Sequence, residues 1–379
     1  MTFLLKPGEL SLKKGNKAIF QRILLRNLTA LLAGTSAQIQ SRDGRIYVNC
    51  ADEAAEQAES AFSHLSGITG WARARTAEKT ENAVIAACVE EARLCFEEGA
   101  KSFKFESRRT DKSFPLTSYK LNCAAGEAVL NALPNFKVNV KNPDVKICVE
   151  IRERAFIYGK EKPALRGLPV GSAGRGLLLL SGGIDSPVAG FLMLLRGLRL
   201  NAIYFHAYPY TSNEAKQKAV MLAALLRRYS INLKLFVANF ASVQQRIKER
   251  APEAWATILL RMAMMEMASM VARREKCACL VTGESLSQVA SQTVENIAST
   301  QSRATLPVLR PLIGMDKESI IKKAVKIGSY PISILPYTDC CSIFSPEHPV
   351  LHSRTDEAAR LYSALELDFS KIELETPAI

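Results

Sequence analysis

Residues 177–186 read Leu-Leu-Leu-Leu-Ser-Gly-Gly-Ile-Asp-Ser, and this stretch decides the fold of the second half of the chain. The four leucines form an apolar run of strand length, and a proline follows where the first turn of a helix is expected. Gly182 and Gly183 permit a tight turn with exposed backbone N–H groups, because neither residue has a Cβ atom. Ser181 and Ser186 add hydroxyl groups, and the positive end of the helix dipole points at the same place. The stretch therefore predicts a strand, a phosphate-binding loop and a helix.

This loop is not a Walker A loop, because the Gly-Lys-Ser/Thr ending is absent. It resembles the SGGxDS loop of ATP pyrophosphatases, which holds the pyrophosphate of ATP while the α-phosphate is transferred to a substrate oxygen. The alternative is a Gly-Gly turn that binds nothing. The order of strand, loop and helix favours the phosphate-binding interpretation.

Composition and charge narrow the class of protein. The chain has 379 residues, 48 % of them hydrophobic, which suits two or three domains with buried cores. The sequence contains no uninterrupted run of about 18 apolar residues, so no membrane-spanning helix is expected. The N-terminus does not have the pattern of a signal peptide. The nine cysteines lie mostly in apolar segments, which favours reduced thiols and a cytoplasmic location. The net charge of +13 favours a polyanionic partner, either nucleic acid or a membrane surface, the alternative being a merely basic protein.

Changes in sequence pattern divide the chain into four segments. Residues 37–40 and 45–48 predict a hairpin near the N-terminus, and helices are expected at 81–99 and 117–132. The expected organisation is an N-terminal α+β domain at 1–56, a second domain at 57–159, a Gly- and Pro-rich linker at 160–174, and an α/β domain at 175–379.

The last segment alternates apolar strands with helices, which predicts a doubly wound parallel sheet. Ligands of such sheets bind at the carboxyl ends of the strands. The expected strands are 177–180, 200–205, 233–237 and 278–282, and the expected helices are 187–196, 212–229, 241–250 and 253–274.

A basic segment follows two alternating phenylalanines in the second domain. Phe103 and Phe105 have the period-2 spacing that is typical of a strand with one buried face, so we expect them in the core. Arg108, Arg109 and Lys112 are expected in the loop that follows, where they would contact the backbone of RNA. The alternative is a solvated basic face.

Seven collinear segments together resemble the tRNA 4-thiouridine synthetases, also called ThiI or tRNA sulfurtransferases. They are GELSLKKGN, FKFESRRTDKSFPLTS, SGGIDSPVAG, HAYPYTSNEAKQK, LVTGESLSQVASQT, LPVLRPLIGMDKE and ILPYTDCCSIF. The resemblance covers essentially the whole chain. It implies an N-terminal ferredoxin-like domain and a THUMP RNA-binding domain, followed by a PP-loop ATP pyrophosphatase domain.

The resemblance also implies a reaction. ATP adenylylates O4 of a uridine, at position 8 of tRNA in this family, and a persulfide sulfur then displaces AMP to give 4-thiouridine. Asp185 would act on the pyrophosphate through Mg²⁺, and Lys317 matches a family active-site lysine that would neutralise charge on phosphate. The implied ATP-binding residues are Leu179, Leu180, Ser181, Gly182, Gly183, Asp185, Ser186, Tyr204, Phe205, Arg261, Gly283 and Gln292.

Two adjacent cysteines are candidates for the sulfur carrier. Cys340 is our choice, because it follows Asp339 in a Pro-punctuated loop where we expect it to be accessible, and Cys341 is the alternative. No segment of the printed chain matches the rhodanese domain of longer members, so we expect a cysteine desulfurase or another persulfide donor as a partner. A homodimer remains an open alternative to a monomer, and an iron–sulfur cluster is disfavoured because Cys277 and Cys279 lack CxxC spacing.

Other functions remain as rivals. An amidating or lysidine-forming ATP pyrophosphatase would not need the cysteine pair, and a non-catalytic RNA-binding protein would not need the complete phosphate loop. A role as sulfur donor in thiamine thiazole formation is secondary, because the family links it with the rhodanese domain. His206 stands at a strand end but has no evident catalytic partner. Met262, Met264, Met265 and Met267 are expected to fill the core rather than to form a site.

Overall fold

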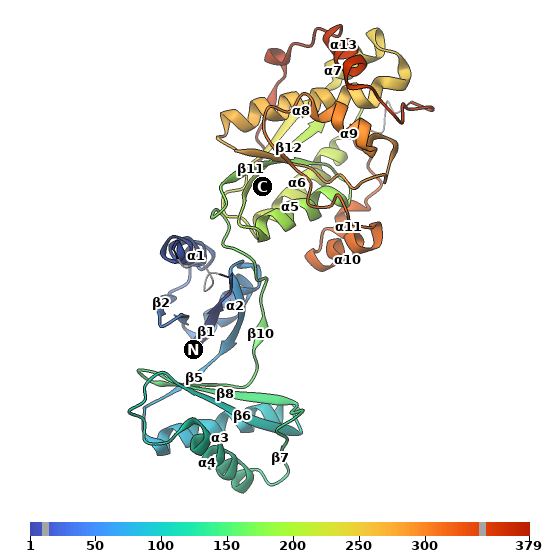
Figure 1. The fold of residues 1–379 in the computed structure, drawn as a ribbon. Coiled ribbons are helices and arrows are strands. Elements are labelled where there is room, and N and C mark those ends of the chain that lie inside the picture. Colours follow the sequence, from blue (N-terminus) through green and yellow to red (C-terminus); the bar gives the residue numbers. More distant parts are fainter. Residues whose placement is uncertain (10–14, 341–345) are drawn as a thin grey trace. The chain divides into compact units, whose positions relative to one another are not determined.

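Three sheets organise the part of the chain that the computed structural model describes, which is residues 1–9, 15–340 and 346–379. Two of the sheets belong to a first unit, Met1–Gly167, and the third belongs to a second unit, Leu168–Ile379 (Figure 1). Each unit has its own hydrophobic core. The mixture of an α+β half and a parallel-sheet half confirms the predicted fold class.

The first sheet is antiparallel, in the order β10-β4-β1-β3-β2. Its core centres on Phe3, Phe62 and Trp71, whose ring centroids lie 5.2 to 5.9 Å apart. Its elements are β1 (Thr2–Pro7), α1 (Lys17–Leu31), β2 (Gln38–Arg42), β3 (Arg45–Asn49), η2 (Asp52–Ala54), α2 (Ala55–His64), β4 (Ile68–Arg73) and β10 (Lys162–Pro163).

This sheet extends beyond the boundary that we expected at residue 56. Strand β4 pairs with β1 along Phe3 to Pro7, so helix α2 and β4 complete the first layer. Strand β10 lies in the segment expected to be a linker, yet it pairs with β4. Pairing between strands that are far apart in sequence leaves no local signal, which is why the pattern placed both boundaries wrongly.

The second sheet has the order β5-β9-β8-β6-β7 and carries two helices. Phe103 and Phe105 are buried in its core, as predicted. Its elements are β5 (Arg75–Ala77), α3 (Glu81–Glu97), β6 (Ser102–Arg109), α4 (Ser118–Ala132), β7 (Lys137–Val138), β8 (Val145–Ile151) and β9 (Ala155–Tyr158). An apolar cluster that includes Tyr47 and Phe156 joins the two sheets of this unit.

The second unit is built on a sheet in the order β15-β14-β11-β12-β13-β16. All neighbours are parallel except β16, which is antiparallel to β13. Both faces are covered, so the strands are apolar along nearly their whole length. The strands are β11 (Arg175–Leu180), β12 (Arg199–His206), β13 (Leu235–Asn239), β14 (Cys279–Val281), β15 (Val308–Leu309) and β16 (Leu374–Glu375).

Helices cover both faces of this sheet, as the predicted doubly wound fold requires (Figure 1). Gly190 of α5 approaches one face so closely that a Cβ atom there would stand 2.7 Å from Leu178 of β11. Helices α7, α8 and α13 share a core with the opposite face. The helical elements are α5 (Asp185–Leu195), α6 (Asn213–Arg227), α7 (Ala241–Arg250), η3 (Glu253–Trp255), α8 (Ala256–Arg274), η4 (Ala290–Gln292), α9 (Val294–Gln301), α10 (Lys317–Ile327), α11 (Tyr330–Ser333), α13 (Thr355–Ser363) and η5 (Phe369–Lys371).

One helix of the described residues, Glu253–Arg274, is both long and apolar. By length and composition it could cross a membrane, but 67 % of its apolar window is buried in the unit. Met262, Met264, Met265 and Met267 are buried in the core of this unit, as predicted. Burial among neighbouring helices and strands therefore accounts for the apolar character of this helix.

Candidate active site

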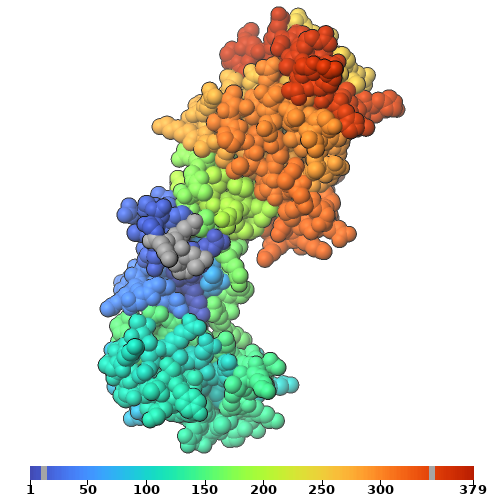
Figure 2. All heavy atoms as spheres, in the orientation of Figure 1, coloured from blue at the N-terminus to red at the C-terminus, as the bar shows by residue number. Residues whose placement is uncertain are grey.

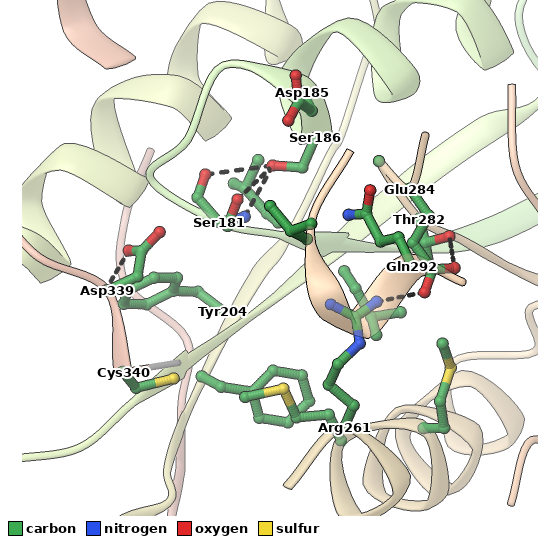
Figure 3. A pocket seen from close by; sticks show the side chains of 17 residues that line it. Ser181, Asp185, Ser186, Tyr204, Arg261, Thr282, Glu284, Gln292, Asp339 and Cys340 are labelled. Carbon is green, nitrogen blue, oxygen red and sulfur yellow. Dashed lines mark hydrogen bonds and ion pairs between the residues drawn. The ribbon is translucent and has the colours of Figure 1, made fainter. Parts of the chain in front are cut away.

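A cavity of about 370 Å³ lies at the carboxyl ends of the parallel strands (Figure 3). The sequence predicted a ligand site at this edge, because strand ends and the loops that follow them meet there. Seventeen residues from six segments of the chain line it. They are Leu179, Leu180, Ser181, Asp185, Ser186, Tyr204, Phe205, Arg261, Met264, Met265, Thr282, Gly283, Glu284, Val289, Gln292, Asp339 and Cys340.

The phosphate loop between β11 and α5 is closed by its own serines. The Ser186 hydroxyl accepts a hydrogen bond from the Ser181 backbone N–H at 2.8 Å, and the two hydroxyl oxygens are 3.0 Å apart. The Gly183 N–H donates to the Ser181 hydroxyl at 3.3 Å. Helix α5 begins at Asp185, so its positive end faces the loop. The local geometry is that of an anion-binding turn.

Gly283 lets the end of β14 touch this loop. A Cβ atom on Gly283 would stand 2.7 Å from the Ser186 backbone nitrogen and 2.9 Å from the Asp185 carbonyl carbon. Both neighbours are backbone atoms, which cannot swing aside as a side chain can. Glycine is therefore the residue that this contact between strand end and loop requires.

Asp185 is held from two sides by residues far away in the sequence. Its Oδ1 accepts from the Lys317 ammonium at 2.7 Å, and its Oδ2 accepts from the Gln288 amide at 3.0 Å. Lys317 begins α10, which lies on the surface of the second unit (Figure 2). Each carboxylate oxygen keeps a further lone pair that could contact a cation.

A single carboxylate suits Mg²⁺ when the other ligands are phosphate oxygens and water. Within the described residues no group of three or more His, Cys, Asp or Glu side chains could form a protein-only metal site. The donor set at Asp185 therefore fits a Mg²⁺ ion that arrives with a nucleotide.

A buried carboxylate fixes the arginine of the cavity. Glu284 is 2 % exposed and forms ion pairs with Arg261 and Arg310, the latter with Nε at 2.7 Å from Oε2. Burial by itself would raise the pKa of Glu284, but the charges of the two arginines and a hydrogen bond from Thr282 outweigh it and lower the pKa. Arg261 thus points across the cavity toward the ends of β14 and the loop after it (Figure 3).

The segment that carries the candidate sulfur residue is tied to the phosphate loop. Asp339 accepts from the Gly182 backbone N–H at 2.9 Å and from the Tyr204 hydroxyl at 3.2 Å. Cys340 lines the cavity but is only 3 % exposed, so the expectation that it is accessible is wrong for this arrangement. Its neighbours in the hydrophobic core, which no local sequence pattern indicates, enclose it. Cys341 lies outside the described residues.

Two further side chains hold this segment in place. The Lys218 ammonium, on α6, donates to the Leu335 carbonyl at 2.9 Å, and the Gln244 amide donates to the Cys340 carbonyl at 2.9 Å. Burial lowers the pKa of Lys218, against the effect of the nearby Asp339 charge. No role was predicted for Lys218, although a lysine on the apolar stripe of a helix is a signal of a buried cation.

Gln288, Glu284 and Arg310 also contribute to the site without a predicted role. All three lie in segments that resemble the family, but their partners are too distant in sequence to be found by spacing. His206 is buried next to Thr211, and its Nδ1 lies 2.9 Å from the Thr211 hydroxyl. Burial lowers the pKa of the His206 imidazole. It does not line the cavity.

The three basic residues expected to contact RNA lie in the first unit. Arg108 and Arg109 are the last residues of β6, so the expectation that they stand in the following loop is wrong for these two. Arg108 pairs with Glu106 at 3.2 Å, and Arg109 donates to the Phe114 carbonyl at 2.9 Å. Lys112 lies in the loop and is exposed.

Three family models match successive parts of the chain. The family model described as ThiI ferredoxin-like domain matches residues 2–72, the THUMP domain model matches 78–159, and the model described as thiamine biosynthesis protein (ThiI) matches 171–367. Together they cover both units.

Whole-chain relatives give the same result. A probable tRNA sulfurtransferase of Treponema pallidum (strain Nichols) is 48 % identical over 368 residues, which cover 96 % of this chain and 92 % of the relative. A probable tRNA sulfurtransferase of Caldanaerobacter subterraneus is 42 % identical over 369 residues, covering 97 % and 96 %. The crystal structure of a 4-thiouridine synthetase–RNA complex with bound ATP is similar over 99 % of both chains, with 31 % identity and a TM-score of 0.90.

Proposed function

The chain belongs to the ThiI family of tRNA sulfurtransferases, and from that membership we propose how its residues divide the work of ATP-dependent thiolation of tRNA. ATP activates O4 of a uridine, position 8 in our proposal, and a sulfur then replaces that oxygen to give 4-thiouridine. The observation that carries the proposal is that one cavity joins the phosphate loop, an oriented arginine and Cys340.

The phosphate loop is the proposed site of pyrophosphate. Ser181 and Ser186 offer hydroxyl groups, and the loop between them offers backbone N–H donors at a helix N-terminus. Asp185 would hold Mg²⁺, which supplies charge neutralisation to the phosphates when bound. Lys317 stands beside Asp185 and adds a positive charge where the bond to pyrophosphate breaks.

The adenosine would occupy the rest of the cavity. Leu179, Tyr204 and Phe205 come from the ends of β11 and β12, and Gly283 and Gln292 come from the opposite wall. Arg261, fixed by Glu284, would face the nucleotide from α8. A half-buried arginine with its position set by a second charge is well suited to bind an anion or a base edge.

Sulfur transfer follows activation of the uridine. The uridine O4 attacks the α-phosphorus, an O–P bond forms, and pyrophosphate leaves. The terminal sulfur of a persulfide attacks C4, a C–S bond forms, and AMP leaves with the former O4. A second thiol then attacks the carrier sulfur, which yields a disulfide and the thiolated uridine, and an external thiol reductant reduces that disulfide.

Cys340 is our proposed persulfide carrier, because its side chain borders the cavity in which the uridine is activated. Cys277 is a poor candidate, since burial raises the pKa of its thiol to about 11 and a thiolate is required. A protein persulfide donor, of the cysteine desulfurase class, is the proposed partner, and a cytoplasmic location is proposed with it. The donor must reach a thiol that is buried here, so the segment around Cys340 has to move.

Paired serine variants test the choice of carrier. Cys340→Ser should consume ATP in the presence of tRNA but give no 4-thiouridine with a desulfurase and cysteine as the sulfur source, as measured by mass spectrometry of tRNA nucleosides. Cys341→Ser should support at least one turnover, and Cys123→Ser, which changes an exposed cysteine of the first unit, should resemble the wild type. Full turnover by Cys340→Ser with none by Cys341→Ser would assign the sulfur to Cys341.

A further inference from the structure

A carboxylate occupies a donor of the phosphate loop. Asp339 Oδ2 lies 2.9 Å from the Gly182 nitrogen, and a Cβ atom built on Gly182 would stand 2.9 Å from Oδ1 of the same side chain. Asp339 thus lies directly against the loop backbone. It is also the residue before Cys340, so this contact fixes the position of that cysteine.

The same N–H belongs to the turn in which we place pyrophosphate. One backbone N–H makes one strong hydrogen bond, so Asp339 and a phosphoryl oxygen are competing acceptors for Gly182. The two acceptors are both anionic, and like charges in a poorly solvated turn repel each other. The loop can therefore hold Asp339 or the pyrophosphate at this donor, but not both.

We propose that Asp339 is a positioning residue that ties Cys340 to the phosphate loop, and that the pyrophosphate of bound ATP displaces it and so releases Cys340 for sulfur loading. This inference rests on the proposed function, because it requires ATP in the cavity. It makes ATP binding the event that opens the buried thiol to its persulfide donor. Cys340 would then receive sulfur only when ATP is bound and the uridine can be activated, and not in the nucleotide-free enzyme.

Lys218 supports this exchange. Its Cδ and Cε atoms would lie 3.2 and 3.3 Å from a Cβ atom on Gly182, so its stem is packed against the loop. Its positive charge acts on Asp339, as the opposing effects on their two pKa values show. When Asp339 leaves, the Lys218 stem remains beside the loop, and its ammonium, which donates to the Leu335 carbonyl, can turn to face the phosphate that replaces the carboxylate.

The carboxylate is also held less firmly than its contacts suggest. Burial raises the pKa of Asp339, despite the Gly182 N–H, the Lys218 charge and the Tyr204 hydroxyl, which lower it. The ionised form is thus less well stabilised in the loop than in water. Release of this carboxylate to solvent recovers hydration, which favours the exchange.

Alkylation of the full-length chain tests the inference without measuring activity. Iodoacetamide labelling is followed by peptide mass spectrometry, with fragment ions that assign the label to Cys340 or Cys341 and with exposed Cys123 as internal reference. Mg²⁺-ATP and inorganic pyrophosphate should each raise the labelling rate of Cys340 about tenfold or more. AMP should not raise it, because AMP places no phosphate in the pyrophosphate turn.

Asp339→Ala should show rapid labelling of Cys340 without nucleotide and no further increase with ATP. Asp368→Ala removes an exposed aspartate that caps η5, and it should behave as the wild type. If Asp339→Ala does not fold, the comparison of pyrophosphate with AMP on the wild type still decides the matter.

Two negative results have different meanings. If calorimetry shows that ATP binds and Cys340 labelling stays unchanged, the exchange at Gly182 is refuted while the proposed function stands. If ATP does not bind, the proposed nucleotide site is refuted, and the exchange with it. An equal acceleration by AMP and pyrophosphate would also overturn the role of the pyrophosphate turn.

Discussion

Substitution of Gly283 by alanine is the sharpest test of the contact between β14 and the phosphate loop. The new methyl group would lie 2.7, 2.8 and 2.9 Å from three backbone atoms of Asp185 and Ser186, whereas ordinary contacts begin near 3.4 Å. The loop or the strand end must therefore move apart by about 0.5–0.7 Å, which is the difference between these distances and an ordinary contact. Such overpacking typically costs about 1–3 kcal/mol. In a unit of this size that corresponds to a fall in Tm of roughly 2–12 °C.

The displaced loop should also catalyse poorly. A misplacement of the order of 1 Å can cost about 10²-fold in rate, so we expect a fall of roughly 10- to 100-fold in tRNA-dependent AMP formation. Thermal unfolding and AMP release, measured on the same preparation, give the two readouts.

Gly183→Ala is the matched control for stability. Its Cβ atom would meet only the Ser181 hydroxyl, at 3.4 Å, and its backbone is outside the left-handed region. We expect a change in unfolding free energy within about 0.5 kcal/mol, as for an unstrained substitution. A Gly283→Ala protein with the wild-type Tm and the wild-type rate would refute the contact, and equal losses in both variants would show that the loop is merely sensitive to any added methyl group.

Three further perturbations address other parts of the molecule. Asp185→Ala should lower tRNA-dependent AMP formation by about 10²-fold or more while tRNA affinity stays near the wild type, since the carboxylate serves the nucleotide; unchanged AMP release would remove the assignment. Replacement of Arg108, Arg109 and Lys112 by glutamine should weaken tRNA binding and reduce the log–log slope of affinity against salt by about two to three, and an unchanged slope would return these residues to a solvated face. Glu284→Gln should lower the unfolding free energy by up to about 3–5 kcal/mol at neutral pH, because it removes the buried charge that pairs with Arg261 and Arg310. The folded-state pKa of Glu284 lies below its usual 4.5. The stabilisation by the Glu284 charge is therefore present above pH 4.5 and is lost as pH falls through the folded-state pKa. A Tm difference between wild type and Glu284→Gln that persists unchanged below pH 4.5 would contradict this role of the charge.

The second unit was the more predictable half, because its signals are local. The run of leucines, the two glycines and the serines lie within ten residues and specify strand, loop and helix together. Helix α7 begins and ends at the predicted residues, Ala241 and Arg250. The resemblance then placed Arg261, Gly283 and Gln292 on one site, and the structure brings all three to the same cavity.

Long-range pairing accounts for what the sequence did not reveal. Glu284 meets Arg261 and Arg310, which stand 23 and 26 residues away on other elements. Asp339 reaches Gly182 across 157 residues. The burial of Cys340 depends on such contacts, whereas the proline-rich local sequence suggested an open loop. Spacing rules describe neighbours along one helix or strand, and they carry no information about partners that only the folded chain brings together.

The short strand β10 has a practical consequence for how the first unit can be cut. The chain leaves the first sheet after β4, forms the second sheet with its two helices, and returns to pair with β4. Beyond the pairing itself, the N–H groups of Ala164 and Arg166 bond to the carbonyls of Thr69 and Ile68.

The second sheet is therefore an insert whose two ends emerge at adjacent strands. A recombinant fragment that stops at residue 159 would remove β10 from one edge of β4 and leave a row of unpaired backbone groups, which is a template for aggregation. A fragment that runs to Gly167 keeps that edge covered. Studies of RNA binding by the isolated first unit should therefore use the longer fragment, and chimaeras that exchange the insert should join the donor sequence between β4 and β10.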